Sequence, residues 1–187
     1  MNVVIFGPPG AGKGTQAQNI VKKFNLHQVS TGDLLRTEIK KKSEIGKEIE
    51  QIISKGDFAT DDIVNKLIKN IIFDPQKKNR LIFDGYPRSL SQAKNLDLLL
   101  DSSNQKIDFI FFLNVNKDTI IKRIERRRIL EKRSDDDLST ILKRYDTYMD
   151  TTRPVLNFYS SRSYFYEIDG GDEISIISSK IEHILNV

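Results

Sequence analysis

The most informative part of the chain is GPPGAGKGT at residues 7–15, which follows the apolar run VVIF at residues 3–6. Glycines let backbone N–H groups turn inward around a phosphate, and the first turn of a helix adds its dipole. The next residues, 16–24, have a helical pattern. Lys13 would stand at the start of that helix, where a cation is unfavourable unless an anion binds beside it. The stretch therefore predicts a phosphate-binding loop in which Lys13 meets the β- and γ-phosphates of a nucleotide.

A second polar position follows another predicted strand. Asp84 ends the apolar run LIF, and in open parallel sheets ligands bind at the carboxyl ends of the strands. Phosphate loops usually carry Ser or Thr directly after the lysine to hold Mg²⁺, but here Gly14 takes that place and Thr15 comes next. Because Mg²⁺ keeps several of its waters, we expect Asp84 to hold it through water. The alternative is an aspartate that only forms a turn with Gly85.

Short apolar runs alternate with longer helical patterns, which is typical of a parallel α/β sheet. The residues between 30 and 60 are helical and polar and contain no strand candidate, so they predict an insertion on the sheet. A closing helix is predicted at residues 173–185. The predicted fold is one α/β domain over residues 1–187, with helices on both faces of a five-stranded parallel sheet. Its strands are predicted at residues 2–6, 27–30, 80–84, 108–115 and 164–168.

Composition limits the classes of protein. The chain has 187 residues, of which 30% are charged, and a formal net charge of +4, which suits either nucleic acid or a site for two polyphosphates. It contains no cysteine, which excludes disulfides and thiolate zinc sites and fits a reducing, cytoplasmic setting. We expect neither a signal peptide nor a membrane span, since no apolar run approaches about 18 residues.

Several motifs, in order along the chain, resemble those of the nucleoside monophosphate kinase family. The loop at residues 7–15 has the family's extra glycine after the lysine. It is followed by STGDLLR at 30–36, DGYPR at 84–88, Arg123 with Arg127, RSDD at 133–136, Arg144, and TRPVLNFY at 152–159. The matches extend from about residue 3 to residue 160. The resemblance implies a P-loop fold in which the segment 30–60 binds the monophosphate and a lid closes over the donor.

Within this family the chain is most similar to adenylate kinases. Thr31 and Gln92 stand where the AMP-specific members carry Thr and Gln. A glutamine amide can accept from the adenine amino group and donate to a ring nitrogen. Gln92 also has a structural interpretation, because Ser89 and Gln92 have the spacing of a capping box. The resemblance favours adenine recognition, and implies reversible transfer of a phosphoryl group from Mg²⁺·ATP to AMP, giving two ADP, by a monomer.

The resemblance also assigns site residues. Guanidinium groups match phosphate oxygens and stay charged, so phosphoryl transfer predicts arginines that converge from separate segments. ATP is expected to contact Gly10, Ala11, Gly12, Lys13, Gly14, Thr15, Arg123 and Arg127. AMP is expected to contact Thr31, Arg36, Ala59, Gly85, Arg88, Gln92, Arg133 and Arg144. The catalytic residues are expected to be Lys13, Arg88, Arg123, Arg133 and Arg144, and Asp84 is expected to serve the metal.

The lid is expected to be very short. Only RILEK separates Arg127 from Arg133, whereas long-lid members carry a sizeable insertion there, sometimes with zinc. The lid is thus placed at about residues 128–133, without zinc. Another departure is Ala59, where a larger aliphatic residue often lies beside the adenine.

Two other classes of protein were weighed. A regulatory GTPase needs an Asn-Lys-x-Asp motif to bind guanine, and in NKDT at 116–119 the aspartate comes one place early. A nucleic-acid-binding protein should combine basic residues with exposed aromatic side chains, and the basic run 122–132 contains none. Both are rejected. A kinase for another monophosphate conflicts with Thr31 and Gln92, while the use of GTP as donor stays open.

Overall fold

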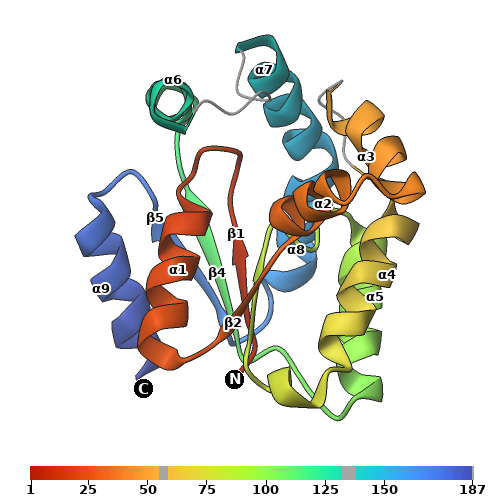
Figure 1. Cartoon of the computed structure of the whole chain (residues 1–187). Helices are drawn as coiled ribbons and strands as arrows, with labels where there is room; N and C mark the ends of the chain where they lie inside the picture. The colour runs from red at the N-terminus through yellow and green to blue at the C-terminus, as the bar shows by residue number, and fades with distance from the viewer. Residues whose placement is uncertain (55–58, 132–137, 187) are drawn as a thin grey trace.

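A computed structural model describes residues 1–54, 59–131 and 138–186 of the chain. Its centre is a five-stranded, wholly parallel sheet in the order β2-β3-β1-β4-β5 (Figure 1). The predicted sheet is therefore confirmed, and each strand lies within one or two residues of its predicted bounds. The strands are β1 (Val3–Phe6), β2 (His27–Ser30), β3 (Leu81–Asp84), β4 (Phe109–Asn114) and β5 (Phe165–Asp169).

Helices cover both faces of this sheet, as its apolar central strands require. On one face lie α1 (Lys13–Phe24) and α9 (Ile174–Leu185), and on the other lie α4 (Asp61–Ile72), α5 (Leu90–Ser102) and α8 (Arg153–Tyr159) (Figure 1). Two clusters of buried apolar side chains occupy these layers. All four residues of β1 are buried because helices pack against both faces of the sheet.

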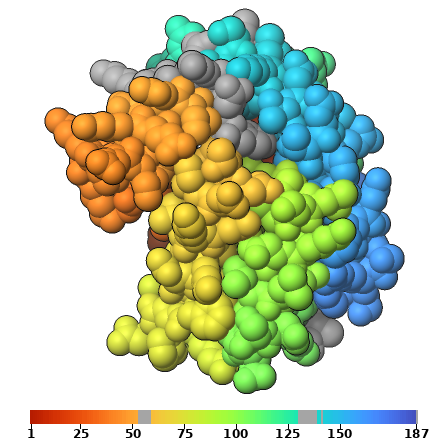
Figure 2. Space-filling view, turned by 90° about the vertical axis from the view of Figure 1, so that its right-hand side faces the viewer, coloured from red at the N-terminus to blue at the C-terminus, as the bar shows by residue number. Residues whose placement is uncertain are grey.

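The remaining elements surround the carboxyl end of the sheet (Figure 1). They are α2 (Thr31–Lys40), α3 (Glu44–Ser54), α6 (Lys117–Glu131), α7 (Leu138–Thr147) and the π-helix η2 (Tyr148–Thr152), while a 3₁₀ helix, η1 (Pro75–Lys77), lies near the other end. Figure 2 shows α2 and α3, in orange, standing out beside the surface formed by α4 and α5. The described residues between 31 and 60 contain no strand, in agreement with the prediction.

The strand register brings distant residues to that same edge. Asp84 pairs with Ile5 of β1 on one side and with Ser30 of β2 on the other. The phosphate loop follows β1 and Thr31 follows β2 directly. Parallel strands thus place the loop, the start of α2 and Asp84 side by side, at the point where the order of the strands reverses.

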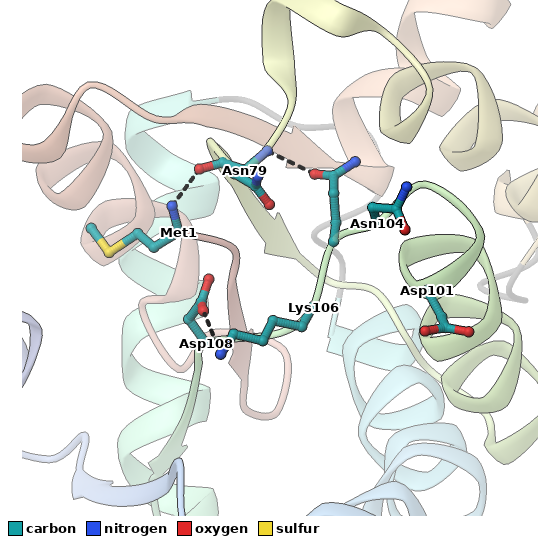
Figure 3. A pocket seen from close by; sticks show the side chains of 7 residues that line it. Met1, Asn79, Asp101, Asn104, Lys106 and Asp108 are labelled. Atoms are coloured by element: carbon teal, nitrogen blue, oxygen red, sulfur yellow. Dashed lines mark hydrogen bonds and ion pairs between the residues drawn. The ribbon is translucent and has the colours of Figure 1, made fainter.

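At the opposite end of the sheet, polar side chains form hydrogen bonds with backbone groups. Gln105 accepts from the backbone N–H of Asn79 over 2.7 Å and donates to the carbonyl oxygen of Ile72 over 3.0 Å, while the buried Asn2 accepts from the backbone N–H of Leu81. A polar hollow lies here, far from the phosphate loop (Figure 3). It is lined by Met1, Asn79, Asp101, Asn104, Gln105, Lys106 and Asp108.

Among the helices within the described ranges, none is both long enough and apolar enough to cross a membrane.

Candidate active site

The loop between β1 and α1 is held in shape by contacts of Lys13 and by close packing against α6. The Lys13 ammonium folds back and donates hydrogen bonds to the carbonyl oxygens of Gly7 at 2.7 Å and Pro8 at 2.9 Å. Gly10 has a φ of +80°, and a Cβ there would lie 2.7 Å from Cγ1 of Ile124 in α6. Only glycine fits this position, because α6 lies directly against the loop. Helix α1 begins at Lys13, so its free N–H groups border the loop.

Asp84 lies next to this loop. A Cβ on Gly14 would stand 3.5 Å from its Oδ2, and the same oxygen accepts a 3.0 Å hydrogen bond from Nε2 of Gln28 in β2. The carboxylate is therefore held at the edge of the sheet by a neighbouring strand. A role for Gln28 was not predicted from the sequence, because the bond joins residues that are distant along the chain.

Arg88 occupies the turn between β3 and α5. Its Nε donates to the carbonyl oxygen of Gly85 over 2.8 Å, and the hydroxyl of the buried Thr31 donates to the same carbonyl over 2.9 Å. Gly85 has a φ of +77°, and a Cβ there would come within 3.0 Å of both the Arg88 guanidinium and the Thr31 hydroxyl. A side chain at Gly85 would thus be strained and would crowd the two polar groups that meet there.

Several cations share this small region. Burial lowers the pKa of Lys13 to about 8, the carboxylate of Asp84 acts in the opposite direction, and Arg88 and Arg127 lower the pKa further. Burial likewise lowers the pKa of Arg88 to about 10; Arg144 and Arg36 lower it further, whereas Asp84 raises it. Partly buried like charges with lowered pKa values are typical of a functional site that binds an anion.

The other predicted arginines differ in position. Nη1 of Arg123 donates to the carbonyl oxygen of Ala11 over 3.3 Å, which places this side chain against the phosphate loop. Arg36 is more exposed and pairs with Asp33 at 2.7 Å. The backbone N–H of Asp33 also donates to the Ser30 hydroxyl, which caps the start of α2. Arg133 lies outside the described residues.

Gln92 takes part in a network that joins two helices. The Ser89 hydroxyl caps α5 by accepting from the backbone N–H of Gln92 over 3.1 Å. A capping box would require the Gln92 carboxamide to accept from the backbone N–H of Ser89. Instead, its Oε1 accepts from the backbone N–H of Arg88 over 2.7 Å. Its Nε2 donates to Oδ1 of Asp61 over 2.7 Å, and Ser89 donates to Oδ2 of the same carboxylate over 2.9 Å.

Comparison with known proteins agrees with this geometry. The family model described as "Adenylate kinase" matches residues 5–164, which is most of the chain. The chain belongs to the adenylate kinase family. An adenylate kinase of Pelagibacter ubique (strain HTCC1062) is 48% identical over an alignment that covers 100% of both chains. An adenylate kinase of Caulobacter sp. (strain K31) is 36% identical and covers 100% of this chain and 99% of its own.

Membership of the adenylate kinase family confirms the predicted resemblance and the predicted class of enzyme, an ATP:AMP phosphotransferase. The family's reaction transfers the terminal phosphoryl group of ATP to AMP and gives two ADP. The structure brings Lys13, Asp84 and Arg88 together; Arg127 lies near enough to lower the pKa of Lys13, and Arg36 and Arg144 lie near enough to lower that of Arg88. Ala59 is buried among apolar side chains of the layer that contains α4 and α5.

In this member of the adenylate kinase family, the predicted site residues also contact residues that were not predicted from the sequence. Besides Gln28 and Asp61, these include Thr152, whose hydroxyl donates to the carbonyl oxygen of Arg88 over 3.0 Å. Thr152 ends the π-helix η2, and such π-helical turns occur often at functional sites. Within the described part of the chain, the buried hydroxyl of Tyr148 at the start of η2 has no hydrogen-bond partner.

Proposed function

We propose that this chain carries out the adenylate kinase reaction with the phosphates of ATP held in the loop at residues 7–15 and the phosphate of AMP held by Arg36 and Arg88. The observation that carries the proposal is the meeting of the half-buried Lys13, the half-buried Arg88 and Asp84 at one edge of the sheet. Phosphoryl transfer needs two nucleotides held in line and their charge neutralised, with little covalent help from the protein. Two half-buried cations that both interact with one carboxylate suit that task.

The remaining arginines would neutralise the group in transit. Arg123 lies against the phosphate loop, and the charges of Arg127 and Arg144 reach Lys13 and Arg88 respectively. Together with Arg133 they would hold the ATP phosphates and the transferring group, since fixed guanidinium forks bind phosphate oxygens without reorganisation. The Lys13 ammonium would leave its two backbone carbonyl partners for the β- and γ-phosphates.

The site fits Mg²⁺ bound through water. The Asp84 carboxylate lies beside the loop and can supply an oxygen ligand, and its Oδ2 is positioned by Gln28. One carboxylate is a typical protein contribution for Mg²⁺, which otherwise keeps water and phosphate ligands. When bound, Mg²⁺ would neutralise charge on the β- and γ-phosphates.

AMP recognition is assigned to the start of α2 and the turn before α5. Thr31, Gly85 and Arg88 already contact one another there, Ala59 would lie beside the adenine, and Gln92 would bind the base edge. We further propose that the segment 30–60 closes over AMP and that a short lid at about 128–133 closes over ATP. The family resemblance favours a monomer in the cytoplasm, and sedimentation velocity would measure its oligomeric state.

A coupled assay with Mg²⁺·ATP against AMP, CMP, UMP and GMP tests the proposal. We expect turnover with AMP far above the others, and parallel reactions with GTP as donor establish the donor preference. Preference for another monophosphate would keep the mechanism and overturn the base assignment. If no monophosphate accepted a phosphoryl group, the assignment of the reaction to this site would be wrong.

A further inference from the structure

We propose that Asp61 is a specificity-determining positioning residue, which fixes the Gln92 carboxamide in the one orientation that binds adenine and disfavours a 6-oxopurine. The inference rests on the proposed role of Gln92 in AMP recognition. It is carried by the hydrogen-bond partners at the two ends of the Gln92 side chain. One is the backbone N–H of Arg88, which can only donate, and the other is the Asp61 carboxylate, which in its ionised form can only accept.

These two partners leave the carboxamide a single favourable orientation. In the observed arrangement Oε1 faces the Arg88 N–H at 2.7 Å and Nε2 faces Oδ1 of Asp61 at 2.7 Å. Rotating the carboxamide by half a turn would set two donors against each other at Arg88 and two acceptors against each other at Asp61. Gln92 is only 3% exposed, so water cannot relieve either conflict.

Asp61 itself is held in place by a second bond. The Ser89 hydroxyl donates to its Oδ2 over 2.9 Å, so both carboxylate oxygens are engaged by groups at the start of α5. Asp61 is the first residue of α4, where the helix dipole favours a negative charge. The carboxylate is therefore held in one orientation by contacts within the protein.

The fixed orientation leaves the carboxamide one donor and one acceptor for a base. Of the two lone pairs on Oε1 and the two N–H groups on Nε2, the bonds made within the described part of the chain use one each. Adenine needs an acceptor for its amino group and a donor for N1. Hypoxanthine needs the reverse, a donor for O6 and an acceptor for N1–H, which Gln92 could supply only after the disfavoured rotation.

Asp61→Asn tests this inference, because an asparagine can face Gln92 with either its oxygen or its nitrogen. The readout is the ratio of kcat/KM for AMP to that for inosine monophosphate, with Mg²⁺·ATP as donor. We expect D61N to lower this ratio about tenfold, the order of one hydrogen bond to a charged group. The ratio compares two substrates on one preparation, so partial unfolding of the variant cancels.

Asp62→Asn is the matched control. Asp62 is exposed, lies in the same first turn of α4 and undergoes the same change of charge, so D62N should leave the ratio unchanged. Gln92→Ala should lower the ratio by itself, and adding D61N to Q92A should lower it no further, since Asp61 acts through Gln92. A purely structural role for Asp61 would not produce that dependence on Gln92.

The outcomes separate the inference from the proposed function. If Q92A lowers the ratio and D61N does not, Asp61 does not set specificity and the inference is overturned alone. If D61N lowers the ratio equally with and without Gln92, Asp61 acts by another route and the inference is likewise wrong. If Q92A leaves the ratio unchanged, the adenine assignment in the proposed function fails, and the inference fails with it.

Discussion

The hydroxyl of Thr152 donates a 3.0 Å hydrogen bond to the main-chain carbonyl oxygen of Arg88. This bond joins the end of η2, and through it α7, to the turn that carries the predicted AMP-binding arginine. Thr152→Val preserves the shape of the side chain and removes the donor. We expect it to lower the free energy of unfolding by about 1 kcal/mol, measured by urea denaturation. Thr151→Val is the control, because that exposed hydroxyl bonds back to Thr147 within the helix. Equal losses of stability in the two variants would show that the contact with Arg88 contributes nothing beyond an ordinary helical hydrogen bond.

Arg88→Ala should lower kcat by at least ~100-fold, since a preorganised contact to developing charge is worth roughly 3–4 kcal/mol. Arg88→Lys should recover little, because an ammonium lacks the guanidinium fork that binds two phosphate oxygens. Steady-state kinetics with AMP and Mg²⁺·ATP measure both variants. Arg80→Ala serves as control, because Arg80 stands at the start of β3 and its guanidinium donates to the carbonyl oxygen of Asn25. Near-normal turnover of R88A would remove Arg88 from the catalytic residues.

The lowered pKa of Lys13 predicts that ATP binding weakens at high pH. In the protein without nucleotide, the Lys13 ammonium has a pKa of about 8 against a usual 10.5, and the proposed contact with ATP requires the protonated form. Phosphate groups, with a second pKa near ~6, are already ionised in this range. The affinity for ATP, measured by calorimetry, should therefore fall as the pH rises above about 8, with a proton taken up on binding. Lys13→Met should bind ATP weakly and without this pH dependence. If the affinity of that variant fell with pH as in the native protein, the pH dependence would belong to another group.

The same shift predicts how the stability of the unliganded protein depends on pH. Between about 8 and 10.5, Lys13 is deprotonated in the folded state and protonated in the unfolded state. The unfolded state then binds more protons, so this residue makes the free energy of unfolding rise with pH across that window. Urea denaturation of the native protein and of Lys13→Met at several pH values isolates the contribution. Parallel curves for the two proteins would contradict the lowered pKa.

Arg162 should stabilise the layer formed by α5 and α8. Its guanidinium pairs with Asp97 at 2.6 Å and lies over the rings of Phe158, Tyr159 and Tyr164. Arg162→Lys keeps the charge but loses the planar contact with the rings, and we expect it to lower the free energy of unfolding by about 1–2 kcal/mol. The exposed pair of Lys180 and Asp172 provides the comparison, since Lys180→Ala should leave the denaturation midpoint unchanged. Equal midpoints for R162K and the native protein would show that the rings contribute nothing beyond the charge.

Much of this architecture was predictable because its signals are local. The runs VVIF and LIF are apolar at every position, as strands buried on both faces must be, and the structure places them in β1 and β3. The phosphate loop was predictable from its glycines and lysine. The helix after it begins at Lys13, where the sequence placed that lysine, because the left-handed Gly12 permits the turn into α1 immediately before it.

The pairings between polar side chains were not predictable in the same way. Asp61 and Gln92 are 31 residues apart, and Thr152 and Arg88 are 64 residues apart. Nothing in an aspartate or a threonine indicates which distant group it will meet until the helices are packed. From the sequence, helix capping and adenine binding by Gln92 were alternatives. In the structure its backbone N–H donates to the Ser89 hydroxyl that caps α5, while its carboxamide makes other contacts and could still meet a base.

The partly buried charges of Lys13 and Arg88 also lead to an expectation about degradation. The cost of their partial burial, which lowers both pKa values, would be relieved by a polyphosphate bound as proposed above. Binding to the folded state alone shifts the unfolding equilibrium by mass action, and proteases act on the opened chain. We therefore expect the resistance of this protein to degradation to follow the supply of its own substrates, and to fall when the nucleotide pool is exhausted.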